Sequence, residues 1–366
     1  MSAGAFAGSL FGDSAADRAM ARVPPVHPTD AVRVLAAALP PHIFLGTSSW
    51  AYPGWRGIVY GTRAPAAALA SDGLAAYAAW PLHRTVGLDR AFYATPSVTE
   101  YRALAALVPD GFRFVVKAEQ RLTRPDMDAA GSTLGSTTAL RAGGRENPDF
   151  LDARFLAERV LVPAAEGLGE RLGPVVLQFP NLDLSARGRL GGTDGFLVRL
   201  AALLRSAARM ATGTAAPPLV VEVRNRELFR GDAVRRYAQC LGESGAVHGY
   251  LQHPTVPTII EQRDALACAG LDPAAGRAVV VRWMLRSGTT YEAASDEFEP
   301  FDRLRAPDEP VRAEVAAMLA LASPARPGFA VINNKAEGSA VRSVEALASA
   351  IAVGRPVPSI PLRSPQ

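Results

Sequence analysis

Short apolar runs alternate along the chain with segments of helical periodicity. A short apolar run bounded by turn-forming residues is typical of a buried strand, whereas apolar positions three or four residues apart predict an amphipathic helix. Strands are expected over 42–48, 84–89, 111–117, 173–179, 218–224, 246–252, 277–283 and 328–334. Helices are expected over about 67–79, 97–107, 150–168, 194–209, 229–243, 258–269, 308–322 and 339–352.

This alternation of strands and helices predicts the fold class. Repeated βα units form parallel sheets, and eight such units are the number found in a (β/α)₈ barrel. We therefore expect an α/β protein built as a single TIM-type barrel with parallel strands, and an open doubly wound sheet is the alternative. Residues 1–40 are rich in Ala, Gly and Pro and predict a flexible N-terminal arm, residues 41–353 the barrel, and residues 354–366, with repeated prolines, a disordered tail.

Two long segments interrupt the regular spacing of the units. Residues 124–149 follow the third expected strand and residues 286–306 follow the seventh. Loops that follow barrel strands lie at the carboxyl-terminal end of the barrel, which is where active sites of this fold are built. We therefore expect both segments to lie over the barrel mouth.

Polar side chains at the carboxyl ends of the expected strands are the candidate site. Their chemistry is that of a polar ligand site, with acids, bases, amides and aromatic rings together. The candidates are Trp50 and Tyr52 after the first strand, Asp89 and Tyr93 after the second, Lys117, Gln178, Glu222 with Arg224, Arg282, and Asn333, Asn334 and Glu337 after the eighth.

Glu222 and Lys117 are the expected catalytic residues. Glu222 and Arg224 are two positions apart in PLVVEVR, so on a strand they face the same side, toward the barrel axis. Glu222 is expected to act as general acid or base, and a structural ion pair with Arg224 or Lys117 is the alternative. Lys117 suits anion binding, or a Schiff base if its amine is desolvated, and a plain salt bridge is the alternative.

The remaining candidates are expected to bind the ligand. Arg224 and Arg282 can each fork onto a carboxylate or phosphate. Gln178 either orients the ligand or pairs with a neighbouring strand, and Asn333 and Asn334 either bind ligand hydroxyls or cap the last helix. An aromatic group suits flat ligands but is equally a packing feature, and it comprises Trp50, Tyr52, Trp55 and Tyr93.

Composition excludes several classes of protein. The 366 residues carry a net charge of +4, mostly through arginine spread along the chain, so no basic run indicates a nucleic-acid surface. No apolar run is long enough for a membrane span, and the N-terminus lacks the pattern of a signal peptide, which predicts a cytoplasmic protein. Cys240 and Cys268 lie in expected helices and are expected to be buried apolar residues.

Cofactor motifs are missing from the sequence. The five histidines have no spacing typical of metal ligands, so no metal site is expected, although a magnesium site made only of carboxylates stays open. No Gly-rich phosphate loop or nucleophile elbow is present. The cofactor is therefore unknown, a small-molecule ligand is the expected partner, and the oligomeric state is not predicted.

Six motifs in order resemble a known family, the YecE-like proteins (domain of unknown function 72). The motifs span about residues 42–350 and read LGTSSWAYPGWRGIVY (45–60), AFYATPS (91–97), GFRFVVKAEQRLTR (111–124), LGPVVLQFP (172–180), VVEVRN (220–225) and INNKAEG (332–338). The resemblance implies a TIM-type barrel, in agreement with the strand count, and implies no particular reaction.

Two positions depart from the pattern of that family. Its second strand usually carries a glutamate where this chain has Gly87, although Asp89 follows on the same strand face. Its seventh strand usually carries a histidine where this chain has Met284. If these groups act as acid and base in relatives, this chain has either divergent chemistry or a binding role.

Three functions are consistent with these features. The first is conversion of a small polar or anionic metabolite at the barrel mouth, with Glu222 as acid or base. The second is a non-catalytic ligand-binding barrel, suggested by Gly87 and Met284. The third is nucleic-acid processing, suggested by the arginine excess and the aromatic residues, which would make binding strongly salt-dependent.

Overall fold

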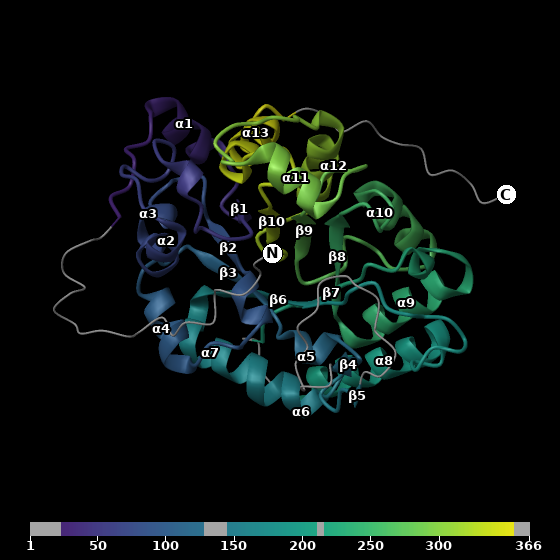
Figure 1. Ribbon diagram of the computed structural model, residues 1–366. Coiled ribbons are helices and arrows are strands. Elements are labelled where there is room, and N and C mark those ends of the chain that lie inside the picture. The colour runs from purple at the N-terminus through teal and green to yellow at the C-terminus, as the bar shows by residue number, and fades with distance from the viewer. Residues whose placement is uncertain (1–22, 128–144, 211–215, 355–366) are drawn as a thin grey trace.

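The computed structural model describes residues 23–127, 145–210 and 216–354. Eight parallel strands close into a barrel in the order β1-β10-β9-β8-β7-β6-β3-β2, with helices around the outside (Figure 1). The fold is therefore the predicted (β/α)₈ barrel and not an open sheet. The barrel strands are β1 Ile43–Thr47, β2 Thr85–Leu88, β3 Arg113–Lys117, β6 Leu172–Gln178, β7 Leu219–Glu222, β8 Val247–Gln252, β9 Val279–Trp283 and β10 Gly328–Ile332.

The helices between the strands follow the expected segments closely. Ser97 begins α4 and Thr258 begins α10, and each forms a capping box with the glutamate three residues later, which fixes where the helix starts. The helices are α1 Asp30–Ala38, α2 Ala66–Asp72, α3 Leu74–Ala78, α4 Val98–Ala105, α5 Gln120–Thr123, α6 Ala153–Phe155, α7 Val162–Leu168, α8 Gly192–Met210, α9 Gly231–Ser244, α10 Ile259–Cys268, α11 Tyr291–Phe298, α12 Glu309–Leu319 and α13 Ala340–Ala352.

Strand and helix faces share one apolar core. The strands are buried on both sides because helices cover the outer face and side chains fill the interior, which explains their nearly continuous runs of Val, Ile and Leu. Branched and aromatic side chains at these positions make burial the main stabilising contribution of the fold. No helix in the described ranges is long and apolar enough to cross a membrane.

The chain ends and the long loops add elements outside the barrel. Within the segment predicted as an arm, residues 30–38 form α1, whose Val32 and Ala36 are buried. Residues 1–22 of that arm and 355–366 of the predicted tail lie outside the described residues, as do residues 128–144 of the first long segment. A short antiparallel pair, β4 Asp126–Met127 and β5 Arg145–Glu146, brackets that segment.

The second long segment folds into a small unit of its own. It contains α11, and its apolar side chains form a separate small cluster against which Tyr52 packs. This unit therefore rests on the loop that follows β1, and it brings Tyr291, at the start of α11, toward the site described next.

Candidate active site

The guanidinium of Arg282 joins three parts of the barrel mouth. Its Nη1 donates hydrogen bonds to Glu222 Oε2 at 2.8 Å and to Gln178 Oε1 at 2.9 Å. Its Nη2 donates to Asp89 Oδ1 at 3.0 Å. Arg282 is on β9, whereas its partners come from β7, from β6 and from the turn after β2, so the side chain reaches across the barrel axis. These four residues are called the Arg282 cluster below.

Strand register brings two members of the Arg282 cluster, Gln178 and Glu222, side by side. Gln178 and Glu222 are directly paired across β6 and β7 as the last residues of both strands. Asp89 begins the 3₁₀ turn Asp89–Phe92 directly after β2. The Arg282 side chain is only 2% exposed and that of Glu222 is 0% exposed, so both charges are removed from water.

Electrostatic compensation within the cluster is strong but incomplete. Burial opposes the charge of Arg282, but the Glu222 and Asp89 carboxylates outweigh burial and hold the pKa of Arg282 above its ordinary value. One oxygen of Glu222, Oε1, is buried and has no hydrogen-bond partner among the described residues. Leaving a buried hydrogen-bond acceptor without a partner costs free energy. A ligand or water that donates a hydrogen bond to this oxygen would remove that cost.

Lys117 ends β3 beside the Arg282 cluster. Its Nζ lies 3.6 Å from the centre of the Phe92 ring, and within the described part of the chain it has no ion pair or hydrogen bond. Burial lowers the pKa of Lys117 from 10.5 to about 7; Asp89 and Glu222 act in the opposite direction, whereas Arg282 and Arg224 add to the lowering. The residue as a whole keeps an intermediate exposure.

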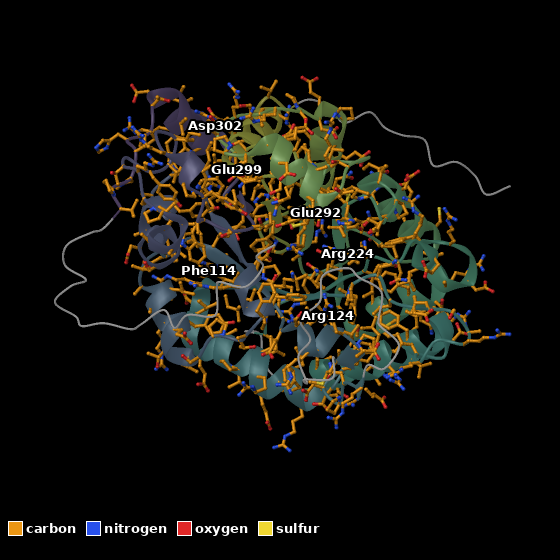
Figure 2. All side chains as sticks on the ribbon, viewed as in Figure 1. Phe114, Arg124, Arg224, Glu292, Glu299 and Asp302 are labelled. Carbon is orange, nitrogen blue, oxygen red and sulfur yellow. The ribbon has the colours of Figure 1, made fainter. Side chains whose placement is uncertain are left out.

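Two arginines, Arg224 and Arg124, have no ion pair within 4 Å among the described residues. Arg224 follows β7 and Arg124 follows α5, and they are close enough for the charge of Arg124 to lower the pKa of Arg224 (Figure 2). Burial is the largest cause of the lowered pKa of Arg224, while the charges of Glu222 and Asp89 act in the opposite direction. Burial also lowers the pKa of Arg124. The Nε atoms of both are buried and unpartnered among the described residues. We call Arg124 and Arg224 the arginine pair.

Phenolic side chains surround Asp89 at the rim. Burial raises the pKa values of Tyr52, Tyr93 and Tyr291, and in each case the charge of Asp89 raises the value further. Tyr93 is 65% exposed and packs edge-on against Phe92, with ring centres 5.5 Å apart. The three phenols therefore lie near enough to the Asp89 carboxylate to be affected by its charge.

A second lysine lies under the same rim. Lys335 follows β10, is 3% exposed, and places its Nζ 4.0 Å from the centre of the Tyr291 ring and 5.2 Å from that of Phe301. Burial lowers its pKa from 10.5 to about 8, while Glu299 and Glu292 favour the charged form. Aromatic faces also stabilise an ammonium, so this lysine is held as a cation more firmly than Lys117.

The expected residues divide into two groups. Asp89, Gln178, Glu222 and Arg282 are in direct contact, and Lys117 and Arg224 lie beside them. The partner of Glu222 is Arg282 rather than Arg224 or Lys117, because Arg282 crosses the axis at the level of Glu222, whereas Arg224 lies beyond the end of β7. The salt bridge considered for Lys117 is not found among the described residues.

The other expected residues have structural contacts. Trp50 is buried, its Nε1 donates to the Leu69 carbonyl at 2.9 Å, and Arg90 stacks over its ring. Asn334 Oδ1 accepts from the backbone N–H of Ala340 at 2.7 Å, which is the capping alternative.

Two further candidates at the end of β10 have structural partners as well. Asn333 Nδ2 donates to Ser48 Oγ at 3.0 Å and so links the ends of β10 and β1. Glu337 is fully buried, accepts a hydrogen bond from the backbone N–H of Asp308 at 2.7 Å, and pairs with Arg312. It therefore stabilises the start of α12 rather than the Arg282 cluster.

Sequence reasoning did not select Arg124, Tyr291 or Lys335 as site residues. Arg124 and Tyr291 lie in the two long segments whose position over the mouth was expected, so their location was available, but nothing in the local pattern distinguished them from solvated residues. Lys335 is adjacent to Asn333 and Asn334, and only its aromatic surroundings reveal it.

The two cysteines differ in burial. Cys240 is buried, and burial raises the pKa of its thiol to about 11. Cys268 is exposed, so the expectation that it is buried was wrong: it ends α10 on the side facing solvent.

Across the described ranges, no three His, Cys, Asp or Glu residues are grouped to hold a metal ion.

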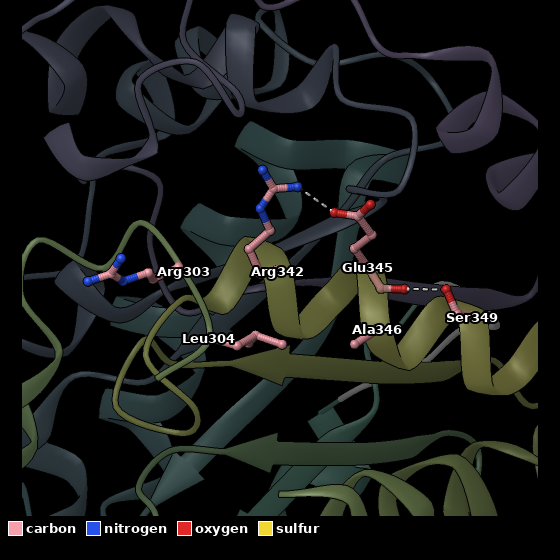
Figure 3. Close-up of a pocket in the computed structure, with 6 residues that line it drawn as sticks. All are labelled: Arg303, Leu304, Arg342, Glu345, Ala346 and Ser349. Atoms are coloured by element: carbon pink, nitrogen blue, oxygen red, sulfur yellow. Dashed lines mark hydrogen bonds and ion pairs between the residues drawn. The ribbon is translucent and has the colours of Figure 1, made fainter. Parts of the chain in front are cut away.

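A surface depression elsewhere on the barrel does not resemble a site. It lies between α13 and the loop before α12 (Figure 3). Its polar groups already pair with one another: Arg342 with Glu345 at 2.8 Å, and the Ser349 hydroxyl with the Glu345 carbonyl at 3.0 Å. The Arg282 cluster and its neighbours are therefore the better candidate.

The fold and this site together define a TIM-type α/β barrel with a charged mouth. The family model described as "Protein of unknown function DUF72" matches residues 44–364, so the chain belongs to this family. This result agrees with the resemblance found in the six sequence motifs.

Solved structures of the same family share the fold. A DUF72 family protein from Enterococcus faecalis is 16% identical, with a TM-score of 0.52 over 84% of this chain and 95% of that chain. One from Thermotoga maritima is 18% identical, with a TM-score of 0.51 over 84% of this chain and 98% of that chain. At such identities the likeness concerns the fold alone. No curated protein matched the chain.

Proposed function

We propose that this barrel binds and converts a small anionic metabolite at its mouth. The observation that carries the proposal is the arginine pair: neither Arg124 nor Arg224 has an ion pair within 4 Å in the described part of the chain, and the Nε atom of each is buried there without a hydrogen-bond partner. Like charges held together and partly removed from water favour an anion between them. Arginine is also well suited to bidentate binding of carboxylate or phosphate.

The ion pairs of Arg282 also support this proposal. Arg282 forms ion pairs with both the Glu222 and the Asp89 carboxylates. Arg124, Arg224 and Lys117 consequently have no ion pair within 4 Å among the described residues, although the charges of Glu222 and Asp89 act on Arg224 and Lys117 from farther away. An incoming anion would supply a close counterion, and its binding would shift the pKa of Lys117 upward.

The proposed catalytic groups are Glu222 and Lys117. Glu222 would act through Oε1, the oxygen that Arg282 does not bind. Lys117, with its lowered pKa, exchanges a proton near neutral pH, which suits a general acid or base. Asp89 and Gln178 would hold Arg282, and through it the Glu222 carboxylate, in a fixed orientation.

A barrel that binds the anion without converting it is the alternative. It follows from Gly87 and Met284, where relatives are expected to carry an acid and a histidine. Asp89, two residues after Gly87, contacts Arg282 directly. This contact favours the catalytic proposal, because a carboxylate is present at the mouth even without an acid at position 87.

Thermal-shift measurements with simple anions test the proposal. Orthophosphate, pyruvate and glyoxylate would be titrated against the parent, Arg124→Ala/Arg224→Ala, and the control Arg199→Ala, which removes an exposed arginine from α8. A ligand at about a hundred times its dissociation constant stabilises by about 2.7 kcal/mol. We expect stabilisation of the parent and the control, and little in the double variant.

Two outcomes would contradict this function. Equal stabilisation of all three proteins would show that the anion binds elsewhere. Absence of any anion effect, together with salt-sensitive binding of single- or double-stranded nucleic acid in a gel-shift titration, would move the function to nucleic-acid processing.

A further inference from the structure

Lysine is rare in this chain, whereas arginine is frequent. The full sequence has 39 lysines and arginines, and only two of these are lysines, Lys117 and Lys335. Lys117 is the last residue of β3, and Lys335 follows β10, so both lie at the carboxyl ends of barrel strands. Every ion pair within 4 Å among the described residues has arginine as its cation. Lysine therefore does not serve as a general source of positive charge in this protein.

The chemical difference between these residues is that burial can lower the pKa of a lysine until it loses its proton near neutral pH, whereas arginine stays charged. A neutral lysine amine is a nucleophile toward carbonyl carbon, particularly when it is desolvated beside other cations. Lys117 meets these conditions: it has no acidic partner within 4 Å among the described residues, its Nζ lies over the apolar Phe92 ring, and Arg282 and Arg224 are close.

We propose that Lys117 is a nucleophile that forms an imine with an anionic aldehyde or ketone, such as a 2-oxo acid. This inference rests on the proposed function, since the arginine pair would hold the carboxylate or phosphate of the substrate. The substrate class is thereby narrowed from anionic metabolites to those that carry a carbonyl group.

The covalent step balances without an oxidant or reductant. The lone pair of Lys117 Nζ forms the N–C bond, and the carbonyl oxygen becomes the hydroxyl of a carbinolamine with the proton that the nitrogen loses. The nitrogen lone pair then forms the C=N bond as the C–O bond breaks, and the hydroxyl leaves as water with the second proton of the nitrogen. Asp89, whose side chain is 33% exposed beside this amine, is placed to relay the proton to the leaving hydroxyl.

Lys335 provides an internal comparison. Its ammonium is enclosed by Tyr291 and Phe301, with Glu299 and Glu292 near it, and it is 3% exposed. These surroundings favour the charged form and restrict access. Reaction of carbonyl compounds should therefore select Lys117 over Lys335.

Reductive trapping tests this inference directly. The full-length protein would be incubated with glyoxylate and cyanoborohydride near pH 7, and peptide mass mapping would locate carboxymethyl groups on Lys117, Lys335 and the terminal amine. We expect Lys117 to react at least about fivefold faster than Lys335, because about half of the former and about a tenth of the latter are unprotonated at pH 7. Orthophosphate should slow labelling of Lys117 by competing for the arginine pair.

The variants Lys117→Arg and Lys335→Arg separate the two proposals. Lys117→Arg keeps the positive charge, so anion stabilisation should persist while the adduct at this position is lost, and Lys335→Arg should leave the adduct unchanged. Anion stabilisation of the parent without any Lys117 adduct would overturn the imine inference and leave the anion site standing. A Lys117 adduct that neither orthophosphate nor Arg224→Ala slows would overturn the anion site, and equal labelling of both lysines would overturn the selectivity on which the inference depends.

Discussion

Arg282 Nη1 and Glu222 Oε2 lie 2.8 Å apart at the barrel axis, joining β9 to β7 across the intervening β8. Both side chains are removed from water. Such a pair contributes little net stability compared with apolar residues, but removing one partner leaves a buried charge without compensation. The two residues therefore depend on each other, whatever else the site does.

Replacement of Glu222 is expected to destabilise the fold. The loss of stability should depend on how well the new side chain still interacts with the charge of Arg282. Glu222→Ala should lower the free energy of unfolding by about 3–5 kcal/mol, because Arg282 loses its most buried counterion. Glu222→Gln should cost less, since an amide oxygen can still accept from Nη1. Chemical denaturation measures both. A Glu222→Ala protein of parental stability that has lost ligand binding would instead assign Glu222 a purely functional role.

Glutamate at position 87 is expected not to fit this barrel. A Cβ atom on Gly87 would lie 3.3 Å from the Ser48 Cα and from Val331 Cγ1, which is tighter than ordinary contact. Asp89, two residues further along the chain, already supplies a carboxylate to Arg282. Gly87→Glu should therefore destabilise the protein by about 1–3 kcal/mol, as expected for overpacking, whereas Gly87→Ala should cost less.

Combining Gly87→Glu with Asp89→Ala tests that interpretation. If the two carboxylates compete for Arg282, the double variant should recover part of the stability lost in Gly87→Glu alone. A Gly87→Glu variant that is as stable as the parent and gains a new activity would support the view that this chain has lost a group that its relatives use.

Lys117→Met is expected to stabilise the protein in a pH-dependent manner. The pKa of Lys117 is lowered in the fold, so the unfolded chain binds more protons between about pH 7 and 10.5 and parental stability rises with pH there. Below pH 7 the buried charge has its full cost. The advantage of Lys117→Met should thus be largest at pH 6–7 and fall above pH 7 by at most about 1.4 kcal/mol per pH unit.

Denaturation of both proteins at pH 6 and pH 9 measures this advantage, with the Lys335→Met protein as a control for the second lysine. A stability difference that is the same at both pH values would show that the Lys117 amine does not lose its proton in this range. It would also weaken the argument for a neutral nucleophile.

The two cysteines should differ in reactivity. A thiol reagent should modify Cys268 rapidly in the native protein, because it is exposed at the end of α10. Cys240 should react only on unfolding, because it is buried and its pKa is raised to about 11, which disfavours the thiolate. Mass mapping before and after denaturation distinguishes them, and rapid native modification of Cys240 would contradict the packing of α9.

The sequence by itself determined the barrel fold and the end of the barrel, the carboxyl-terminal one, at which its polar residues lie. Alternation of apolar runs and helical segments fixes parallel βα units, and the ends of parallel strands meet at one side of the barrel. For that reason Asp89, Gln178, Glu222 and Arg282 could be selected together before any contact was known. Local pattern was sufficient because each of these side chains belongs to a strand or to the first turn after one.

Only the tertiary structure decided which charges pair and which stay free. The spacing of Glu222 and Arg224 indicated a pair along one strand, but Arg282 reaches Glu222 from across the axis, and distances across a closed barrel are not encoded in the spacing along a strand. The same holds for Arg124, whose charge acts on Arg224 although the two residues are far apart in the sequence. The amine of Lys117 owes its lowered pKa to burial among these groups, and burial is a property of the assembled fold.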